Sequence, residues 1–328
     1  MLETGRPTQV LCLGEALIDR LGPPGGDPLV DRPFDDRLGG APANVACALA
    51  RLGTSAAFLG RLGADDIGAS FQALFKDRGV DRAGLQIDPE RPSRVVLVRR
   101  DRSGERTFQG FAGDAGLGFA DQALAAEGLA EAWPQLATVA SWLLIGTIPL
   151  ATPQSAQALH CAVDLARRQG TAIALDVNWR PTFWDASADP GSGPAPVALK
   201  AIQPLLQQAA LIKLAREEAL WFFGSDDPAH IQAALPQQPA VVVTDGAQPV
   251  RCRMDGVSAQ IPAFKPSKVV DTTGAGDAFT AGLLHRWAAP VPERLRFAAA
   301  CGALVCGGAG AIDPQPTESE VVSFGGMS

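Results

Sequence analysis

The segment with the clearest capacity for chemistry lies near the end of the chain and reads Asp-Thr-Thr-Gly-Ala-Gly-Asp-Ala-Phe over residues 271–279. Its two glycines let the backbone turn tightly, and apolar residues at helical spacing after them predict that a helix begins here. Unpaired N–H groups at a helix start, with the positive end of the helix dipole, form a site for an anion. Asp277 falls in the first turn of this helix. Its carboxylate beside an anion site is explained by phosphoryl transfer, in which it accepts a hydroxyl proton while the amides hold the phosphoryl group. Taken alone, the same residues also fit a helix start with an acidic cap.

A second glycine-rich segment, Gly-Gly-Ala-Pro-Ala-Asn over residues 39–44, also leads into a predicted helix. Gly39 and Gly40 would let a small ligand approach the backbone, and the side-chain amide of Asn44 offers both donors and an acceptor to its hydroxyl groups. Asp19, just after the first predicted strand, adds a carboxylate, which can only accept hydrogen bonds from the ligand hydroxyl groups. Paired glycines with Asp and Asn are typical of a polyol site, although a turn followed by a capped helix fits this segment equally well.

The elements that must position these residues alternate between short apolar strands and helices. Strands are predicted at residues 10–14, 56–60, 142–145, 171–177, 211–214 and 241–243. Helices are predicted at residues 42–52, 154–169 and 275–287, with one more that is capped by Asp65 and Asp66 and ends at Gly79. This alternation predicts an α/β fold with a mostly parallel sheet and helices on both of its faces. Ligands of such sheets bind beyond the carboxyl ends of the strands.

Two segments interrupt the alternation. Residues 20–38 are rich in Gly, Pro and Asp without a helical period, and residues 93–109 alternate around an Asp-Arg-Ser-Gly turn at 101–104, which is typical of a hairpin. Together they predict a small β-flap over the edge of the main sheet. We find no internal repeat and no linker, so residues 1–328 are expected to form a single domain.

Charge and composition exclude several classes of protein. The chain of 328 residues carries 28 Lys and Arg against 35 Asp and Glu, a formal net charge of −7, without a basic cluster that would bind nucleic acid. The six cysteines form no Cys-x-x-Cys pair and the three histidines are widely separated, which argues against a zinc site or a disulfide framework and favours a reducing compartment. Residues 1–9 show no leader, and the longest apolar run, residues 139–151, is too short to span a bilayer. We therefore expect a cytoplasmic protein without membrane or nucleic-acid partners.

Other nucleotide and hydrolase motifs are missing from the sequence. It contains no Gly-x-x-x-x-Gly-Lys-Ser/Thr, no Gly-x-Gly-x-x-Gly after the first strand and no Gly-x-Ser-x-Gly. These absences argue against a P-loop, a dinucleotide-binding oxidoreductase and a serine hydrolase, respectively.

Three segments in order resemble the ribokinase-like (PfkB) sugar kinases: Gly-Glu-Ala-Leu-Ile-Asp at 14–19, Gly-Gly-Ala-Pro-Ala-Asn-Val-Ala at 39–46, and the segment at 271–279. The resemblance extends from about Val10 to Val321. It implies a three-layer α/β/α sandwich with a small β-sheet lid, with ATP as the phosphoryl donor and Mg²⁺ as the metal ion.

The resemblance also implies roles for individual residues. Asp277 resembles the catalytic base and also a contact to the sugar, with Gly274, Ala275 and Gly276 as the anion hole. The residues similar to the family's sugar contacts are Asp19, Gly39, Gly40, Asn44, Asn178 and Arg180. Arg180 would approach the sugar or the transferred phosphate, where a guanidinium stabilises developing charge.

The nucleotide and metal sites are implied in the same way. Thr244 and Gly246, with Gly274 and Gly276, resemble nucleotide-binding residues, and Glu218 resembles the residue that orders an Mg²⁺-bound water. Asp271 and Thr273, with the backbone near residues 308–309, resemble a site for a monovalent cation such as K⁺. The chain departs from the family pattern at Ala215, where Asn or Ser is usual, and at Pro249, where the nucleotide loop usually has a second Gly.

Among these kinases the chain most resembles the fructokinases, which implies transfer of the γ-phosphoryl group of ATP to the 6-hydroxyl of D-fructose. A 2-keto-3-deoxygluconate kinase, or another ribokinase-like sugar or nucleoside kinase, is the alternative. A catalytically silent sugar- or nucleotide-binding regulator of the same fold is the alternative of a different class. The exposed strand edge of the flap predicts a homodimer paired through the lid.

Overall fold

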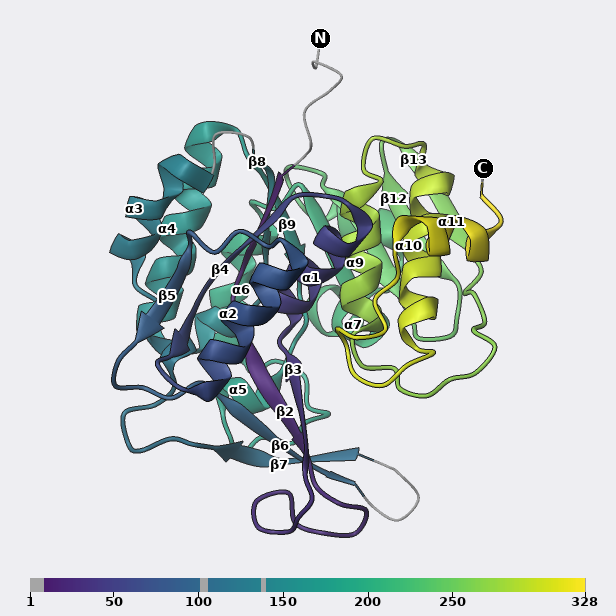
Figure 1. Ribbon diagram of the computed structural model, residues 1–328. Coiled ribbons are helices and arrows are strands. Elements are labelled where there is room, and N and C mark those ends of the chain that lie inside the picture. The colour runs from purple at the N-terminus through teal and green to yellow at the C-terminus, as the bar shows by residue number, and fades with distance from the viewer. Residues whose placement is uncertain (1–8, 101–105, 137–139, 328) are drawn as a thin grey trace.

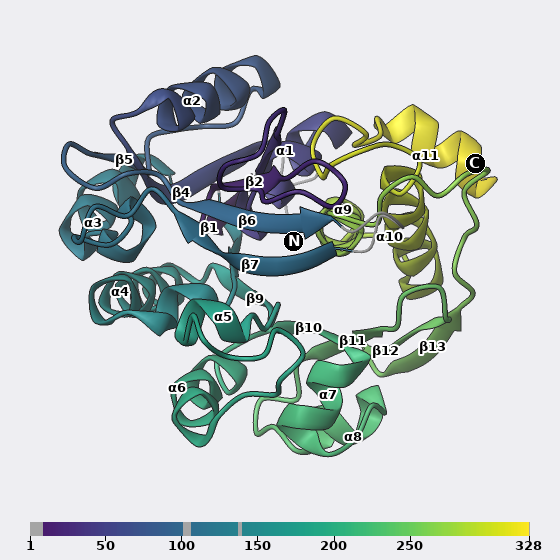
Figure 2. The same cartoon turned by 90° about the horizontal axis from the view of Figure 1, so that it is seen from below.

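A long twisted sheet runs through the centre of the protein (Figures 1 and 2). The computed structural model describes residues 9–100, 106–136 and 140–327, and over these residues the sheet has nine strands. In spatial order they are β13 (Val257–Ile261), β12 (Val250–Met254), β11 (Ala240–Thr244), β10 (Leu211–Ala215), β9 (Ala172–Asp176), β8 (Ala140–Ile145), β1 (Gln9–Leu13), β4 (Ala56–Gly63) and β5 (Leu85–Asp88). The strands from β11 to β5 pair in parallel, and β12 and β13 add an antiparallel edge. The mostly parallel sheet predicted from the sequence is confirmed.

Helices cover both faces of this sheet. On one face lie α1 (Ala41–Leu52), α2 (Asp66–Arg78), α9 (Ala275–His285), α10 (Val291–Val305) and α11 (Glu318–Gly325). On the other lie α3 (Ala126–Leu136), α4 (Pro153–Gln169), α6 (Pro196–Leu206), α7 (Arg216–Phe223) and α8 (Pro228–Ala233). Alternate residues of β1 enter the two cores, with Val10 and Cys12 on one side and Leu11 and Leu13 on the other. The result is the expected three-layer α/β/α sandwich.

The local sequence explains where individual helices begin and end. The Asp65 side chain accepts a hydrogen bond from the N–H of Gly68 and caps α2, which ends at Gly79 in the left-handed conformation. The last helix of the predicted set, α9, ends at His285, two residues before the predicted end at Trp287. Trp287 lies outside the helix, but its ring packs against Trp142 of the sheet and so contributes to the core.

A second, four-stranded sheet projects from the carboxyl-end edge of the main sheet, at the bottom of Figure 1. Within the described residues its order is β3 (Asp35–Gly39), β2 (Leu17–Leu21), β6 (Val95–Arg100) and β7 (Arg106–Ala112). This sheet is the lid expected from residues 20–38 and 93–109, and its strands lie within residues 17–39 and 95–112. The predicted turn at 101–104 lies outside the described residues.

Three short elements complete the described chain, namely η1 (Ala120–Ala123), η3 (Ile148–Ala151) and α5 (Pro181–Trp184). Of these, η1 packs on β4 and α4, and η3 packs on α4, α5 and α6. Across residues 9–100, 106–136 and 140–327, every helix is too short or too polar to cross a bilayer.

Candidate active site

A cavity of about 570 Å³ lies where the carboxyl ends of the central strands meet the lid. Its lining brings together most of the residues singled out from the sequence, namely Asp19, Gly40, Asn44, Asn178, Arg180, Glu218, Thr244, Thr273, Gly274, Gly276 and Asp277. Lid residues Val96, Val98 and Phe108 form an apolar wall. Asp271 lies in an adjoining cavity of about 270 Å³ that shares Asp19, Arg180 and Thr273. The pockets described here do not include Gly39, Ala275 or Gly246 in their linings.

The start of α9 forms the floor of this cavity. Gly274 precedes the helix with a φ of 79°, and a Cβ there would lie 2.5 Å from Cβ of Ala311, so both conformation and space require glycine. The N–H of Ala275 donates to the carbonyl of Thr272 at 3.2 Å. Within the described chain the N–H groups of Gly276 and Asp277 have no backbone acceptor. These two amides at the positive end of the helix are available to an anion.

The carboxylate of Asp277 is tied to the second glycine-rich segment. Nδ2 of Asn44, in α1, donates to Oδ2 of Asp277 at 2.8 Å. Burial raises the pKa of Asp277 to about 6, against the opposing effect of this hydrogen bond. A carboxylate with such a pKa is suited to take a proton from an alcohol near neutral pH. Oδ1 of Asn44 is buried without a partner in the described residues, which leaves an acceptor for a ligand hydroxyl.

Gly39 and Gly40 allow the lid strand β3 to approach this site closely. A Cβ on Gly39 would lie 2.9 Å from Oδ2 of Asp19, and one on Gly40, whose φ is 98°, would lie 2.6 Å from the carbonyl oxygen of Glu15. Gly39 therefore leaves room for the carboxylate of Asp19, which faces the cavity, and Gly40 leaves room for the backbone at Glu15.

A buried ion pair beside α9 was missed by the sequence analysis. Lys213, in β10, places Nζ 3.0 and 3.1 Å from the two carboxylate oxygens of Asp176, at the end of β9. The hydroxyl of Thr280 in α9 donates to the same carboxylate at 2.8 Å. One sequence feature could have revealed it, since Lys213 is a charged residue inside an otherwise apolar strand.

Glu218 holds two segments of backbone at the edge of the cavity. Its carboxylate accepts hydrogen bonds from the N–H of Trp179 at 2.6 Å and of Ala215 at 2.8 Å. Burial raises its pKa, opposed by the charge of Lys213. No group of three His, Cys, Asp or Glu side chains within the described residues could hold a metal ion by itself. Mg²⁺ is commonly held by one or two carboxylates, waters and substrate phosphates, so a single carboxylate beside the anion site fits this ion.

The segments predicted to hold a monovalent cation and the nucleotide each contribute residues to the lining of these two cavities. The Asp271 carboxylate accepts hydrogen bonds from the N–H and hydroxyl of Thr273, at 3.0 and 2.6 Å, and from the N–H of Gly310 at 2.9 Å. Thr244 ends β11 beside the cavity, whereas Gly246 is exposed in the tight turn before β12. Pro249 lies at the end of this turn, which the hydrogen bond from Gln248 N to Asp245 O closes at 2.8 Å.

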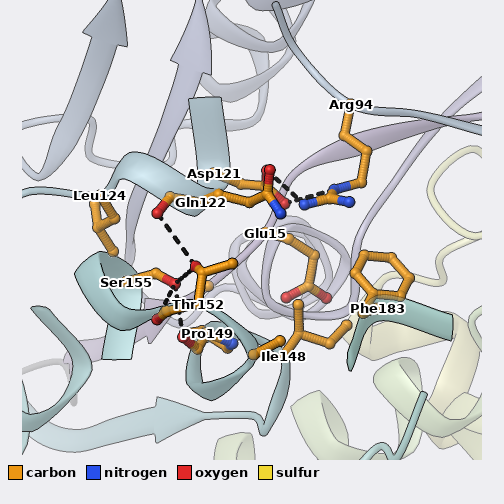
Figure 3. A pocket seen from close by; sticks show the side chains of 12 residues that line it. Glu15, Arg94, Asp121, Gln122, Leu124, Ile148, Pro149, Thr152, Ser155 and Phe183 are labelled. Carbon is orange, nitrogen blue, oxygen red and sulfur yellow. Dashed lines mark hydrogen bonds and ion pairs between the residues drawn. The ribbon is translucent and has the colours of Figure 1, made fainter. Parts of the chain in front are cut away.

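A second buried ion pair, also missed from the sequence, holds the base of the lid (Figure 3). Arg94 donates to both carboxylate oxygens of Asp121 at 2.8 and 3.0 Å. Its guanidinium carbon lies 4.4–4.9 Å from the ring centres of Phe111, Phe119 and Phe183. The pair thereby joins β6 and β7 of the lid to η1 and α5 of the body.

Glu15 lies beside this ion pair (Figure 3) and also lines the large cavity. It is 3% exposed, and one oxygen accepts a hydrogen bond from the N–H of Ala41 at 3.1 Å. Burial raises its pKa to about 8, so the group is mostly protonated at neutral pH. Glu15 therefore positions the Gly40–Ala41 turn as a largely neutral side chain.

Comparison with known proteins agrees with this geometry. The family model of the pfkB family carbohydrate kinases matches residues 7–318. The chain belongs to this family. It is 32% identical to fructokinase-1 of Oryza sativa subsp. japonica over 333 residues, covering 98% of each chain. Membership makes the protein a phosphotransferase that acts on a carbohydrate hydroxyl, as the sequence motifs predicted.

Solved structures of pfkB relatives share the fold over nearly their whole length. The fructokinase of Xylella fastidiosa with bound ATP superimposes with a TM-score of 0.80 at 30% identity, covering 96% of this chain and 97% of that one. The fructokinase of Vibrio cholerae O395, solved with fructose, ADP and calcium ion, gives a TM-score of 0.79 at 26% identity, covering 97% and 98%. The prediction of a ribokinase-like fold is therefore confirmed.

Proposed function

We propose that this kinase transfers the γ-phosphoryl group of ATP to the 6-hydroxyl of D-fructose, giving fructose 6-phosphate and ADP. The observation that carries the proposal is the 2.8 Å hydrogen bond between Asn44 and Asp277, which joins the polyol-type segment to the anion-binding helix start in one cavity. The fructokinases among its relatives support fructose as the acceptor and ATP as the donor.

In this mechanism the 6-hydroxyl oxygen forms a bond to the γ-phosphorus, and the bond from that phosphorus to the β–γ bridging oxygen breaks. ADP leaves with the electron pair of the broken bond, and the hydroxyl proton passes to the carboxylate of Asp277. The amides of Gly276 and Asp277 hold the phosphoryl oxygens, with Gly274 setting the turn. Ala275 is assigned to the same anion hole.

The sugar would be held by Asp19, Asn44 and the backbone at Gly39 and Gly40. Asn178 and Arg180 approach it from the end of β9, while Thr244 and Gly246 contact the nucleotide.

Two ions complete the proposal. Mg²⁺, when bound, neutralises charge on the donor phosphates, and Glu218 would hold it through a water molecule. Asp271 and Thr273 would hold a monovalent cation such as K⁺ beside the anion site.

We further propose that residues 1–328 act as one domain in the cytoplasm. The lid would close over the sugar to exclude water as a competing acceptor and would pair with a second lid in a homodimer.

The decisive experiment measures ADP release from ATP and Mg²⁺ with a panel of sugars that includes fructose, ribose and 2-keto-3-deoxygluconate. Fructose should give the highest kcat/KM, and phosphorus NMR of the product should show a 6-phosphate. A preference for 2-keto-3-deoxygluconate would replace the proposed substrate. Nucleotide binding without ADP release for any sugar would instead favour a silent regulator.

A further inference from the structure

We infer that Lys213 is a catalytic residue whose ammonium group binds an oxygen of the phosphoryl group during its transfer. This inference rests on the proposed phosphoryl transfer and adds a side chain that the family motifs in the sequence do not include. The step itself is the one written above, and Lys213 stabilises charge on the transferred group without exchanging a proton.

The position of the ammonium group supports this role. A Cβ on Gly276 would meet Nζ of Lys213 at 3.1 Å, so the charge lies next to the amide that opens on the anion site. Lys213 lines the large cavity together with Gly276 and Asp277. Its partner Asp176 is not part of that lining, so within the pair it is the cation that faces the ligand.

The hydrogen bonds of Lys213 leave it able to bind a ligand. An ammonium group has three N–H donors, and within the described chain its hydrogen-bond partner is the carboxylate of Asp176. Thr280 donates to that carboxylate as well, which fixes the acceptor and with it the direction of the lysine side chain. A cation held in place before the substrate arrives needs little reorganisation during the reaction.

The charge balance of the cavity favours a catalytic role over a purely structural one. Burial favours the neutral amine, but the carboxylates of Asp176, Glu218 and Asp277 outweigh it and raise the pKa of Lys213, so the group is charged. Those carboxylates would repel ATP unless cations offset them. Arg180, the other cation of the lining, is exposed and donates to the carbonyl of Trp179. A buried ion pair adds little stability compared with apolar residues, so stability alone does not explain Lys213.

The test compares two affinities, one for ADP with aluminium fluoride and one for ADP alone. Aluminium fluoride imitates the phosphoryl group in transfer, so the ratio of the first affinity to the second measures how well the site binds that group. Both are measured by calorimetry with fructose present. The Lys213→Met/Asp176→Asn double variant removes the cation without leaving a buried carboxylate unpaired, and Asp176→Asn is its reference. Lys200→Met, on the exposed side of α6, is the matched surface control.

We expect the affinity ratio of the double variant to fall roughly 10²–10³-fold below that of Asp176→Asn, with kcat falling in parallel and the affinity for ADP and fructose retained. Equal ratios in the two variants would overturn the inference. Should the double variant fail to fold, the affinity ratio of Lys213→Gln is compared with that of wild type instead, because Gln can still donate a hydrogen bond to Asp176. Wild-type turnover of fructose reports separately on the proposed substrate, and if another sugar is preferred the affinities are measured with that sugar.

Discussion

Replacing Asp277 by Asn should make the protein more stable while it abolishes most of the activity. The pKa of this carboxyl group is about 6 in the folded protein, against an ordinary value of 3.8, because burial disfavours its charged form. At 1.36 kcal/mol for each pH unit, this difference corresponds to at most about 3 kcal/mol of destabilisation at pH 7. Water reaches part of the side chain and lowers this figure. Asn is neutral, has the same shape and can still accept the hydrogen bond from Asn44.

The sign of the pH dependence follows from the direction of the pKa shift. Below about pH 4 the group is protonated in both the folded and the unfolded chain, so the shift contributes no stability difference. Between about pH 4 and pH 6 the unfolded chain loses the proton while the folded protein keeps it, and the wild type becomes less stable as the pH rises. Above about pH 6 both forms are ionised and the difference is constant.

Urea unfolding of wild type and Asp277→Asn between pH 4 and pH 8 measures this difference. The excess stability of the variant should grow from pH 4 to pH 6 and then level off. Steady-state assays should show kcat reduced by roughly 10²–10⁴-fold, and kcat/KM of the wild type should fall as the pH drops below about 6. An excess stability that is the same at every pH would refute the buried-carboxylate argument, and near-normal kcat would refute the role as a base.

Three other substitutions test separate parts of the site. Asp19→Ala should raise KM for the sugar with the melting temperature unchanged, and unaltered sugar kinetics would remove this residue from the binding site. Gly274→Ala should cost about 1–3 kcal/mol in urea unfolding because of its positive φ and the contact with Ala311, and wild-type stability would contradict the strain. Arg94→Met should lower the free energy of unfolding by about 3–5 kcal/mol, because it leaves the carboxylate of Asp121 buried and unpaired. If adding Asp121→Asn restores the stability, the loss comes from the unpaired charge; if it does not, the loss comes from packing.

Local patterns were sufficient to predict most of the elements. The apolar strands alternate with helices that carry their own start and stop residues, such as the Asp65 cap and Gly79 of α2. Their order along the chain indicates a parallel sheet because each pair of strands is separated by a crossover. The glycine-rich start of α9 was predicted for the same reason, since the turn, the open amides and Asp277 all lie within one short segment.

The lid was predicted less accurately because its strands come from distant segments. β2 pairs in parallel with β6, and the residues between them include four elements of the body, α1, β4, α2 and β5. The sequence indicated a flap, but where its strands begin and end is decided by pairing across this distance.

What the sequence by itself determined is the family, the alternation of elements and the residues of each motif, because these depend on neighbours along the chain. Only the tertiary structure decided that Asn44 meets Asp277 across 233 positions, and that Lys213 and Thr280 share the carboxylate of Asp176. The placement of Glu15 beside the pair of Arg94 and Asp121 is of the same kind. The physical reason is that a buried charged group requires a partner, and which partner it meets is set by the order of the strands in the sheet rather than by separation in the chain.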